Sequence, residues 1–140
     1  MIKYQPLKST NKGFTLFESL LVLFIVSFLA IGLSGAVGHT FQSVQEKVFL
    51  WEFEHLYKES QQLAITSQQN VHLQVSNQKL TNGYQMVQVP KNVVIEQESE
   101  LTFNQEGGNS SLAKIRFQFP EKTVTYQLYI GSGRYKKTEE

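Results

Sequence analysis

The chain has 140 residues, a formal net charge of +1 and no cysteine. This length suits one modest domain, and the near-neutral charge is unlike that of proteins that bind nucleic acid mainly by neutralising phosphates. The lack of cysteine excludes a disulfide framework, a cysteine nucleophile, a thiolate metal site and a lipoprotein-type anchor. The chain also lacks Asp, so any acidic pair would consist of Glu alone.

The N-terminal third of the chain combines a short polar leader with a long uncharged run. Residues 1–13 contain three lysines, whereas residues 19–38 contain no charged side chain. A helix of twenty residues is about 30 Å long, which matches the hydrocarbon thickness of a bilayer. Basic residues precede the run and mostly acidic ones follow it, so the positive-inside rule places the N-terminus in the cytoplasm and the polar remainder outside.

Three ordinary explanations of this run are a secretory signal peptide, a plain single-pass anchor and a buried core helix. The apolar region of a signal peptide spans only about 7–15 residues, and a fold of this size cannot easily cover a helix that is apolar on all sides. A plain anchor fits the length but gives Glu18 no role. An acidic side chain costs on the order of 2.5–3.5 kcal/mol near the centre of an apolar helix, and less near an end, so Glu18 marks a functional site.

A cut between Gly13 and Phe14 would supply a partner for Glu18. The cut creates an ammonium group four residues before Glu18, which is one helical turn away, in the same chain or in a staggered neighbour. In surroundings of low dielectric constant such a pair attracts strongly and sets the axial register of neighbouring helices.

The residues that surround this position carry a resemblance to a known family. Residues 12–18 read Lys-Gly-Phe-Thr-Leu-Phe-Glu and precede about twenty apolar residues, which resembles the class III signal of type IV pilins and pseudopilins. The resemblance implies cleavage after Gly13 by a prepilin peptidase, N-methylation of Phe14 and a role for Glu18 in recruiting the subunit to a filament.

The apolar run departs from the family pattern in one respect. Major pilins commonly have a helix-kinking Pro in this segment, whereas this chain has Gly32, Gly35 and Gly38 instead. These glycines fit close helix packing, a locally melted stretch, or the ordinary enrichment of glycine in membrane helices.

Beyond the run, the sequence predicts a helix that continues from His39 to about Ser67. Its apolar residues fall into two adjoining stripes with three- and four-residue spacing. The first stripe contains Phe41, Val44, Val48 and Trp51, and the second contains Phe49, Phe53, Leu56 and Leu63. We therefore expect one long helix, apolar all round at its start and amphipathic afterwards.

After residue 69 the apolar period changes to two, which predicts β-strands. The candidate strands are residues 71–75, 84–89, 93–95, 101–103, 115–119 and 124–130. Asn82-Gly83 predicts a turn, residues 120–122 predict a hairpin, and residues 107–111 predict a loop.

The predicted fold class is α+β, with the long N-terminal helix packed on a small, mostly antiparallel sheet of four to six strands. The expected segments are a leader (1–13), a transmembrane or filament-core helix (14–38), an amphipathic continuation (39–69) and a β-sheet domain (70–140).

A second resemblance lies in the C-terminal part. Residues 101–119 and the closing Gly131-Ser132-Gly133-Arg134 resemble the sheet of minor pseudopilins from the competence (DNA-uptake) pili of Gram-positive bacteria. This implies a structural subunit that contacts other major and minor pseudopilins, the prepilin peptidase and the cytoplasmic membrane, and that reaches the cell surface after assembly. The alternatives are a minor pseudopilin of a type II secretion system and a bitopic membrane protein with an unrelated extracellular binding module.

The sequence gives no sign of an enzyme. It contains no phosphate-binding glycine loop, zinc-protease helix or metal-spaced cluster, and its histidines (His39, His55 and His72) are far apart in the sequence. We predict no catalytic residue, no metal and no cofactor.

Direct contact with DNA is an alternative use of the C-terminal region. A basic groove with stacking rings would suit single strands. The candidates are the basic Lys114, Arg116, Arg134, Lys136 and Lys137 and the aromatic Tyr126, Tyr129 and Tyr135. Solvated strands explain these residues better, so DNA contact has no direct support from the sequence.

Overall fold

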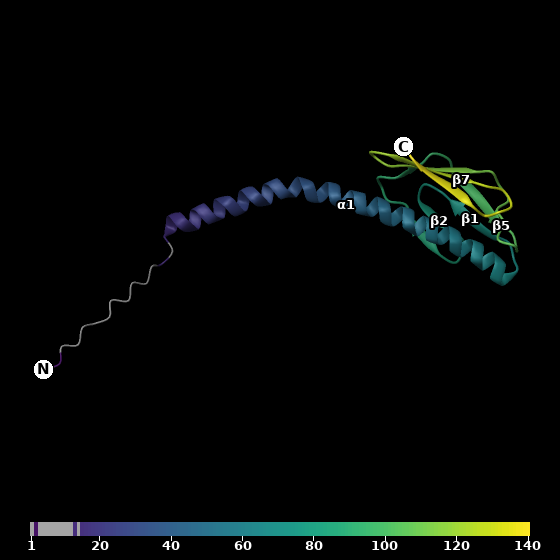
Figure 1. Cartoon of the computed structure of the whole chain (residues 1–140), viewed down its shortest axis with the longest axis horizontal. Helices are drawn as coiled ribbons and strands as arrows, with labels where there is room; N and C mark the ends of the chain where they lie inside the picture. Colours follow the sequence, from purple (N-terminus) through teal and green to yellow (C-terminus); the bar gives the residue numbers. More distant parts are fainter. Residues whose placement is uncertain (1, 3–12, 14) are drawn as a thin grey trace. The chain divides into compact units, whose positions relative to one another are not determined.

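The computed structural model describes Ile2, Gly13 and residues 15–140, except for the side chains of residues 36 and 37. A single helix, α1 (Leu16–Ser67), precedes the strands (Figure 1). The strands are β1 (Val71–Val75), β2 (Lys79–Thr81), β3 (Met86–Gln88), β4 (Val94–Ile95), β5 (Ser99–Phe103), β6 (Lys114–Gln118), β7 (Thr123–Leu128) and β8 (Tyr135–Glu139). The chain forms two compact units, residues 1–41 and residues 42–140.

In the first unit, α1 exposes every described side chain between Leu16 and Leu33. This part of the helix contains a window with a mean hydropathy of 2.6 that is long enough to cross a membrane. An apolar helix that its own unit does not cover needs lipid or other helices around it. The expected long helix with an apolar start is therefore confirmed.

The helix ends where the sequence predicts, at Ser67. Gln68 adopts a left-handed backbone conformation with φ of 53°. Its side-chain amide donates a 2.8 Å hydrogen bond to the carbonyl of Ile65. A left-handed residue after the last turn stops a helix, and the amide satisfies one of the carbonyls that the end of the helix leaves without a partner.

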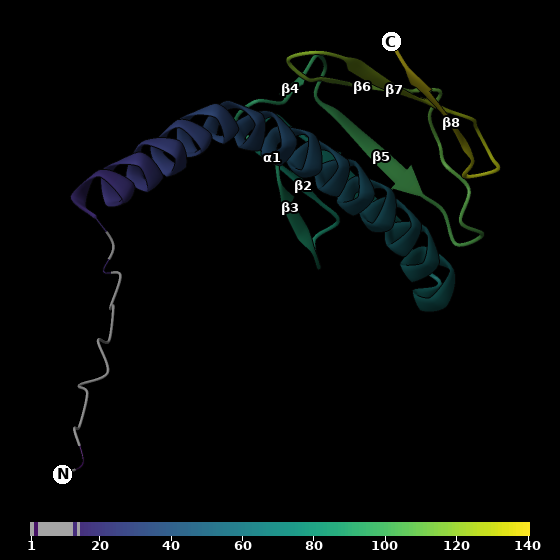
Figure 2. The same ribbon diagram turned by 60° about the vertical axis from the view of Figure 1, so that its left-hand side comes forward.

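The second unit contains two four-stranded sheets, in the orders β3-β2-β1-β5 and β4-β6-β7-β8, and all of their strand pairs are antiparallel. Figure 2 shows these strands gathered beside the C-terminal part of α1. The predicted hairpin is present, because β6 pairs with β7 and the N–H of Phe119 donates to the carbonyl of Lys122. The α+β fold class is thus confirmed, with two small sheets in place of a single sheet of four to six strands.

The β2–β3 hairpin turns at Asn82-Gly83, as predicted, and Gly83 has a φ of 86°. The Oδ1 atom of Asn82 accepts hydrogen bonds from the N–H groups of Tyr84 (3.0 Å) and Gln85 (2.7 Å). Its Nδ2 atom donates to the hydroxyl of Ser60 on α1 at 3.0 Å. These bonds place Tyr84 and Gln85 in the turn, and β3 is therefore shorter than the predicted strand.

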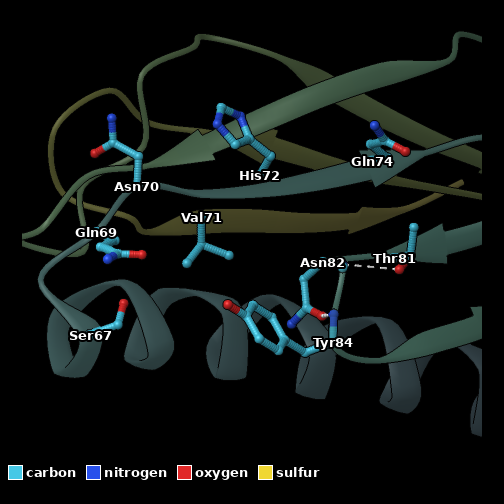
Figure 3. Close-up of a pocket in the computed structure, with 10 residues that line it drawn as sticks. Ser67, Gln69, Asn70, Val71, His72, Gln74, Thr81, Asn82 and Tyr84 are labelled. Atoms are coloured by element: carbon cyan, nitrogen blue, oxygen red, sulfur yellow. Dashed lines mark hydrogen bonds between the residues drawn. The ribbon is translucent and has the colours of Figure 1, made fainter.

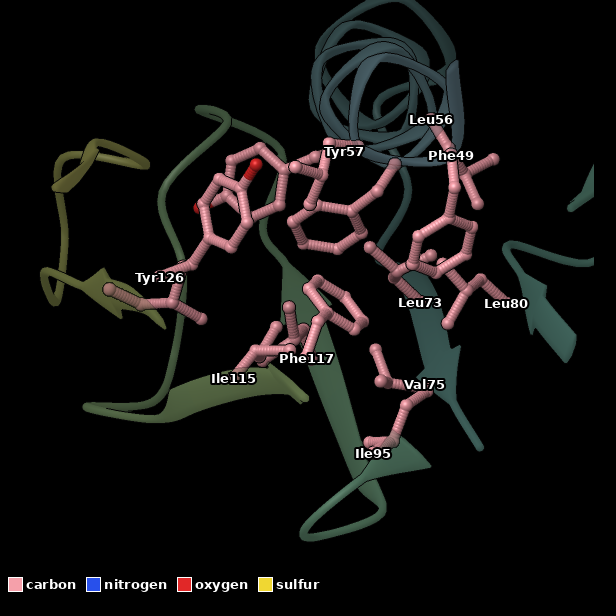
Figure 4. Packing of buried hydrophobic residues seen from close by; sticks show 14 of the residues in the cluster. Phe49, Leu56, Tyr57, Leu73, Val75, Leu80, Ile95, Ile115, Phe117 and Tyr126 are labelled. Atoms are coloured by element: carbon pink, nitrogen blue, oxygen red, sulfur yellow. The ribbon is translucent and has the colours of Figure 1, made fainter. Parts of the chain in front are cut away.

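The core of the second unit lies between α1 and the two sheets (Figure 4). The ring of Phe53 on α1 packs edge-on against Phe117 and Tyr126, with centroid distances of 5.0 and 4.8 Å. Aromatic pairs with this geometry add about 0.5–1.5 kcal/mol to the benefit of burial. The second predicted stripe faces this core, since Phe49, Phe53 and Leu56 are buried and Leu63 is partly buried.

Two loops close onto the buried side of α1. The hydroxyl of Tyr57 donates to the carbonyl of Gly133 at 3.2 Å, and the amide of Gln61 donates to the carbonyl of Gly107 at 2.8 Å. Gly133 has a φ of 60°, and a Cβ atom there would overlap the Gln61 side chain and the Gly107 carbonyl. This close approach explains why glycine is needed in the closing loop.

Candidate processing and assembly site

The candidate site lies at the start of α1. Gly13 is exposed, and no atom lies within 4 Å of the position that a Cβ atom would occupy. Phe14, the residue expected to become the new N-terminus and to be methylated, lies outside the described residues. Thr15 precedes the first helical residue, Leu16, and Glu18 lies within the first helical turn.

Thr15 and Glu18 form a capping box at this helix start. The backbone N–H and the hydroxyl of Thr15 donate to Oε2 of Glu18 at 3.2 and 3.4 Å. The Oγ1 atom of Thr15 accepts from the N–H of Glu18 at 3.2 Å. Such a box satisfies N–H groups that have no partner inside the helix, and the carboxylate also lies at the positive end of the helix dipole.

This geometry corrects one step of the sequence argument. Glu18 has a structural role even in a chain that has not been cut, so its presence does not by itself exclude a plain anchor. Thr15 has a local signal in the sequence, because a Thr followed three residues later by Glu ahead of an apolar run is a known sign of a capping box. The signal was therefore available at residues 15–18.

Neither the histidines nor a metal cluster offers a second site within residues 15–140. The described residues contain no group of three or more potential metal ligands. His72 on β1 lies 3.0 Å from the hydroxyl of Thr102 and 3.1 Å from a carboxylate oxygen of Glu100. His55 on α1 stacks on Trp51 with a centroid distance of 5.4 Å. Both rings therefore have neighbours that account for their positions.

A pocket of about 310 Å³ lies beside β1 and the β2–β3 turn (Figure 3). Its lining contains His72 and otherwise uncharged residues: Ser67, Gln69, Asn70, Val71, Gln74, Thr81, Asn82, Gly83 and Tyr84. The Asn82 side chain is already bound to the turn and to Ser60. The Nδ1 atom of His72 contacts Thr102 and Glu100, which do not line the pocket.

Two of the five cations considered for DNA contact lie beside acids. Lys137 lies 3.1 Å from a carboxylate oxygen of Glu54, and Arg116 lies 3.2 Å from one of Glu96. Lys114 and Lys136 are exposed and both pair in register with Gln127, so they lie near each other on one sheet face.

The tyrosines considered as stacking platforms are mostly part of the core. Tyr126 is fully buried and its hydroxyl donates to Glu54 at 2.7 Å, while Tyr135 packs against the core. Burial and the hydrogen bond to Glu54 both raise the pKa of Tyr126. Tyr129 is exposed. The alternative in which Tyr126 and Tyr135 act as stacking platforms therefore gains no support from their packing.

A capped apolar helix that its own unit leaves exposed, followed by a compact α+β unit, is the arrangement expected of a type IV pilin-like subunit. Residues 8–34 match the prokaryotic N-terminal methylation motif, which covers the end of the leader (8–13), Glu18 and most of the apolar run. No solved structure matches the chain.

Comparison with curated proteins identifies the family within this class of subunits. Competence protein ComGD of Streptococcus pneumoniae (strain ATCC BAA-255 / R6) is 47% identical over 136 residues, which cover 97% of this chain and 85% of that protein. The chain belongs to the ComGD family of competence proteins. It is a minor pseudopilin, a structural subunit of a competence pilus.

Proposed function

We propose that this subunit is made as a precursor, is cut after Gly13 by a prepilin peptidase and is N-methylated at Phe14. One observation carries the proposal: Glu18, capped by Thr15, stands at the head of an exposed apolar helix inside the methylation motif. Gly13 itself is exposed and uncrowded, which suits a residue that a peptidase must reach. After the cut, Glu18 is the fifth residue of the mature chain.

The charge of Glu18 acts in assembly. Both hydrogen bonds from Thr15 end on Oε2 of Glu18, within the first helical turn. The ammonium group of the mature N-terminus would form one residue before Thr15, whose hydrogen bonds hold the Glu18 carboxylate. Between neighbouring subunits the same attraction sets how far one helix slides along another, because two unlike charges in apolar surroundings attract strongly only at short distance.

The proposal includes an orientation in the cytoplasmic membrane. The lysine-containing leader (1–13) stays in the cytoplasm until it is removed, and the apolar segment (14–38) spans the bilayer. The amphipathic continuation (39–69) and the β-sheet domain (70–140) face the outside and reach the cell surface after assembly. The partners are the prepilin peptidase, the membrane, and other major and minor pseudopilins.

The role is structural, with no catalytic residue, metal or cofactor. The ComGD family is a family of pilin-like structural proteins, and membership in it favours a competence pilus over a type II secretion system or an unrelated bitopic protein. DNA contact is not part of the proposal, because the nearby cations are partly paired and two of the three candidate rings pack in the core.

Glu18→Val tests the assembly role. The variant keeps the apolar run, so insertion and cleavage should match the natural chain, while the amount of subunit in sheared pili should fall by about tenfold or more, the effect of losing roughly 1.4 kcal/mol of attraction. Natural levels of this variant in sheared pili would refute the role of Glu18.

A further inference from the structure

Strand β1 loses its neighbour β2 partway along its length. The β1–β2 ladder ends at the pair of Gln74 and Thr81, because β2 ends at Thr81. On β5, the carbonyl of Thr102 accepts a hydrogen bond from the N–H of Ser110 on the side away from β1. Thr102 and its partner His72 are therefore a pair without main-chain hydrogen bonds between them. The N–H and carbonyl of His72 thus point away from β5, to the side that β2 has left.

The pocket of about 310 Å³ lies at this break in the sheet (Figure 3), and we call it the β1 pocket. Its lining comes from the end of α1, from β1 with the segment that leads into it, and from the end of β2 with the turn that follows. The volume is at the low end of the range of small-ligand sites, about 300–1,000 Å³. The break in the sheet therefore leaves a cavity of the size that a small ligand needs.

Many polar side chains of the lining are free to bind a ligand. In the described part of the chain, five of them are exposed and make no side-chain hydrogen bond: Ser67, Gln69, Asn70, Gln74 and Tyr84. Three of the five are amides and two are hydroxyls, and both kinds of group donate as well as accept hydrogen bonds. The β1 pocket therefore offers neutral groups that can each give and take a hydrogen bond.

The charges around the β1 pocket disfavour an ionic ligand. The described residues that line it include no Lys, Arg or Glu. His72 is the one lining residue that can become a cation, and its Nδ1 atom lies 3.1 Å from a carboxylate oxygen of Glu100. A phosphate or a carboxylate would therefore find no cation without a partner, and an ammonium group would find no acid in the lining. Burying an unpaired charge is costly, so the ligand that fits is neutral.

An added peptide strand suits the β1 pocket less well than a compact ligand does. Strand addition requires a run of open main-chain groups and pockets for alternate side chains. The Asn82-Gly83 turn borders the pocket and limits the length of such a run. Val71, the aliphatic residue of the lining, is only 5% exposed. The pocket therefore has little apolar surface for the side chain of a peptide.

We propose that the β1 pocket binds a neutral pyranose sugar. The Tyr84 ring is 78% exposed and extends from the turn toward Ser67 (Figure 3), so a flat apolar surface lies beside the neutral polar groups. A pyranose has the matching surfaces, because its C–H face packs on an aromatic ring and its hydroxyls donate and accept. Gln74 and the main-chain groups of His72 bind these hydroxyls. The site lies within the second unit and does not require removal of the leader.

Saturation-transfer difference NMR with the full-length chain tests the proposal. The chain is kept in a zwitterionic detergent, because maltoside and glucoside detergents carry the kind of head group that is under test. The neutral probes are glucose, galactose, N-acetylglucosamine, lactose and diacetylchitobiose, and the anionic controls are glucuronate and N-acetylneuraminic acid. We expect saturation transfer to the ring protons of at least one neutral probe, several-fold above the anionic controls.

Substitutions then locate the binding site. Tyr84→Ala should weaken binding of the responding sugar about tenfold, the effect of losing one good ring contact. The Tyr84 N–H that bonds to Asn82 stays in place, so the turn is retained. The matched control is Tyr129→Ala, because Tyr129 is also exposed and lies outside the β1 pocket. Gln74→Ala should weaken binding several-fold, and circular dichroism verifies that each variant is folded.

Three results would overturn the sugar site. The first is no saturation transfer to any neutral probe, or equal transfer to the anionic controls. The second is unchanged binding in folded Tyr84→Ala and Gln74→Ala, or an equal loss in Tyr129→Ala, because either would place the sugar elsewhere. The third is stronger transfer to a neutral Gly-Ser peptide than to every sugar, which would identify the open edge of β1 as a site for a peptide strand.

Discussion

Thr15 and Glu18 hold each other at the start of α1: the Thr15 N–H donates to Oε2 of Glu18 and the Glu18 N–H donates to Oγ1 of Thr15, each at 3.2 Å. The acid that the proposed function assigns to assembly is therefore also part of a helix cap. The two roles have different chemical requirements, because a cap needs an acceptor atom whereas pairing with an ammonium group needs a negative charge. Substitutions at Glu18 can separate them.

Glu18→Gln keeps the acceptor and removes the charge, because Gln also serves in a capping box. We expect this variant to insert, to be cut and to retain its helix start, yet to fall in sheared pili as far as Glu18→Val does. Immunoblots of the membrane fraction measure insertion and cleavage, and immunoblots of the sheared fraction measure assembly. If Glu18→Gln assembles normally while Glu18→Val does not, the cap and not the charge is what assembly needs.

Gly13→Val should block processing and leave the fold unchanged, since a side chain at residue 13 meets no atom within 4 Å. The precursor should accumulate with its thirteen leader residues, as an intact mass would show. Gly32→Ala is the matched control, because that position is equally open and lies far from the cut. Normal cleavage of the Gly13 variant would mean that the peptidase cuts elsewhere.

Gly133→Ala should destabilise the second unit more than Gly131→Ala. Both glycines have positive φ, at 60° and 79°, which costs an alanine about 1–2 kcal/mol. Only at Gly133 would the added carbon also overlap Gln61 and Gly107, whereas the space at Gly131 is open. Urea unfolding in detergent, followed by near-ultraviolet circular dichroism, gives the free energy of unfolding of each variant. Equal losses of this free energy in the two variants would contradict the close packing at Gly133.

The second unit should lose stability between pH 10 and about pH 12. Burial, and then the neighbouring Tyr135, raise the pKa of Tyr57 from 10.0 to about 12. As the pH rises, the unfolded chain therefore releases the Tyr57 proton before the folded chain does. The contribution of Tyr57 to the free energy of unfolding is thus complete below pH 10 and declines as the pH rises toward the pKa of the folded chain. Tyr57→Phe should make the decline of the unfolding free energy shallower, and an unchanged slope would show that Tyr57 does not titrate in this way.

The sequence was sufficient for elements whose signal is local. The apolar run, the end of α1 at Ser67, the Asn82-Gly83 turn and the β6–β7 hairpin all follow from spacing and turn chemistry. The division into two sheets does not follow from spacing and turn chemistry, because β1 pairs with β2 and also with β5, which is more distant in the sequence. Strand β8 was also missed: four of its five residues are exposed, so it shows no alternation.

The roles of Gly13, Phe14 and Glu18 stay predictions, and the structure adds a hydrogen-bonded helix cap that the sequence pattern alone does not describe. Gly13, Phe14 and Glu18 follow from the motif, whereas the hydrogen bonds from Thr15 depend on where the helix begins. Likewise, both helical stripes are visible in the sequence, but only the positions of the sheets decide that Phe53 is buried and Trp51 exposed. Periodicity shows which residues share a face and leaves open what covers it.

The intact mass of the protein extracted from membranes and from sheared pili tests the central claim most directly. The account predicts a chain that begins at Phe14, comprises residues 14–140 and carries one additional methyl group on its N-terminal nitrogen. A working, pilus-associated protein that still retains residues 1–13 would contradict it.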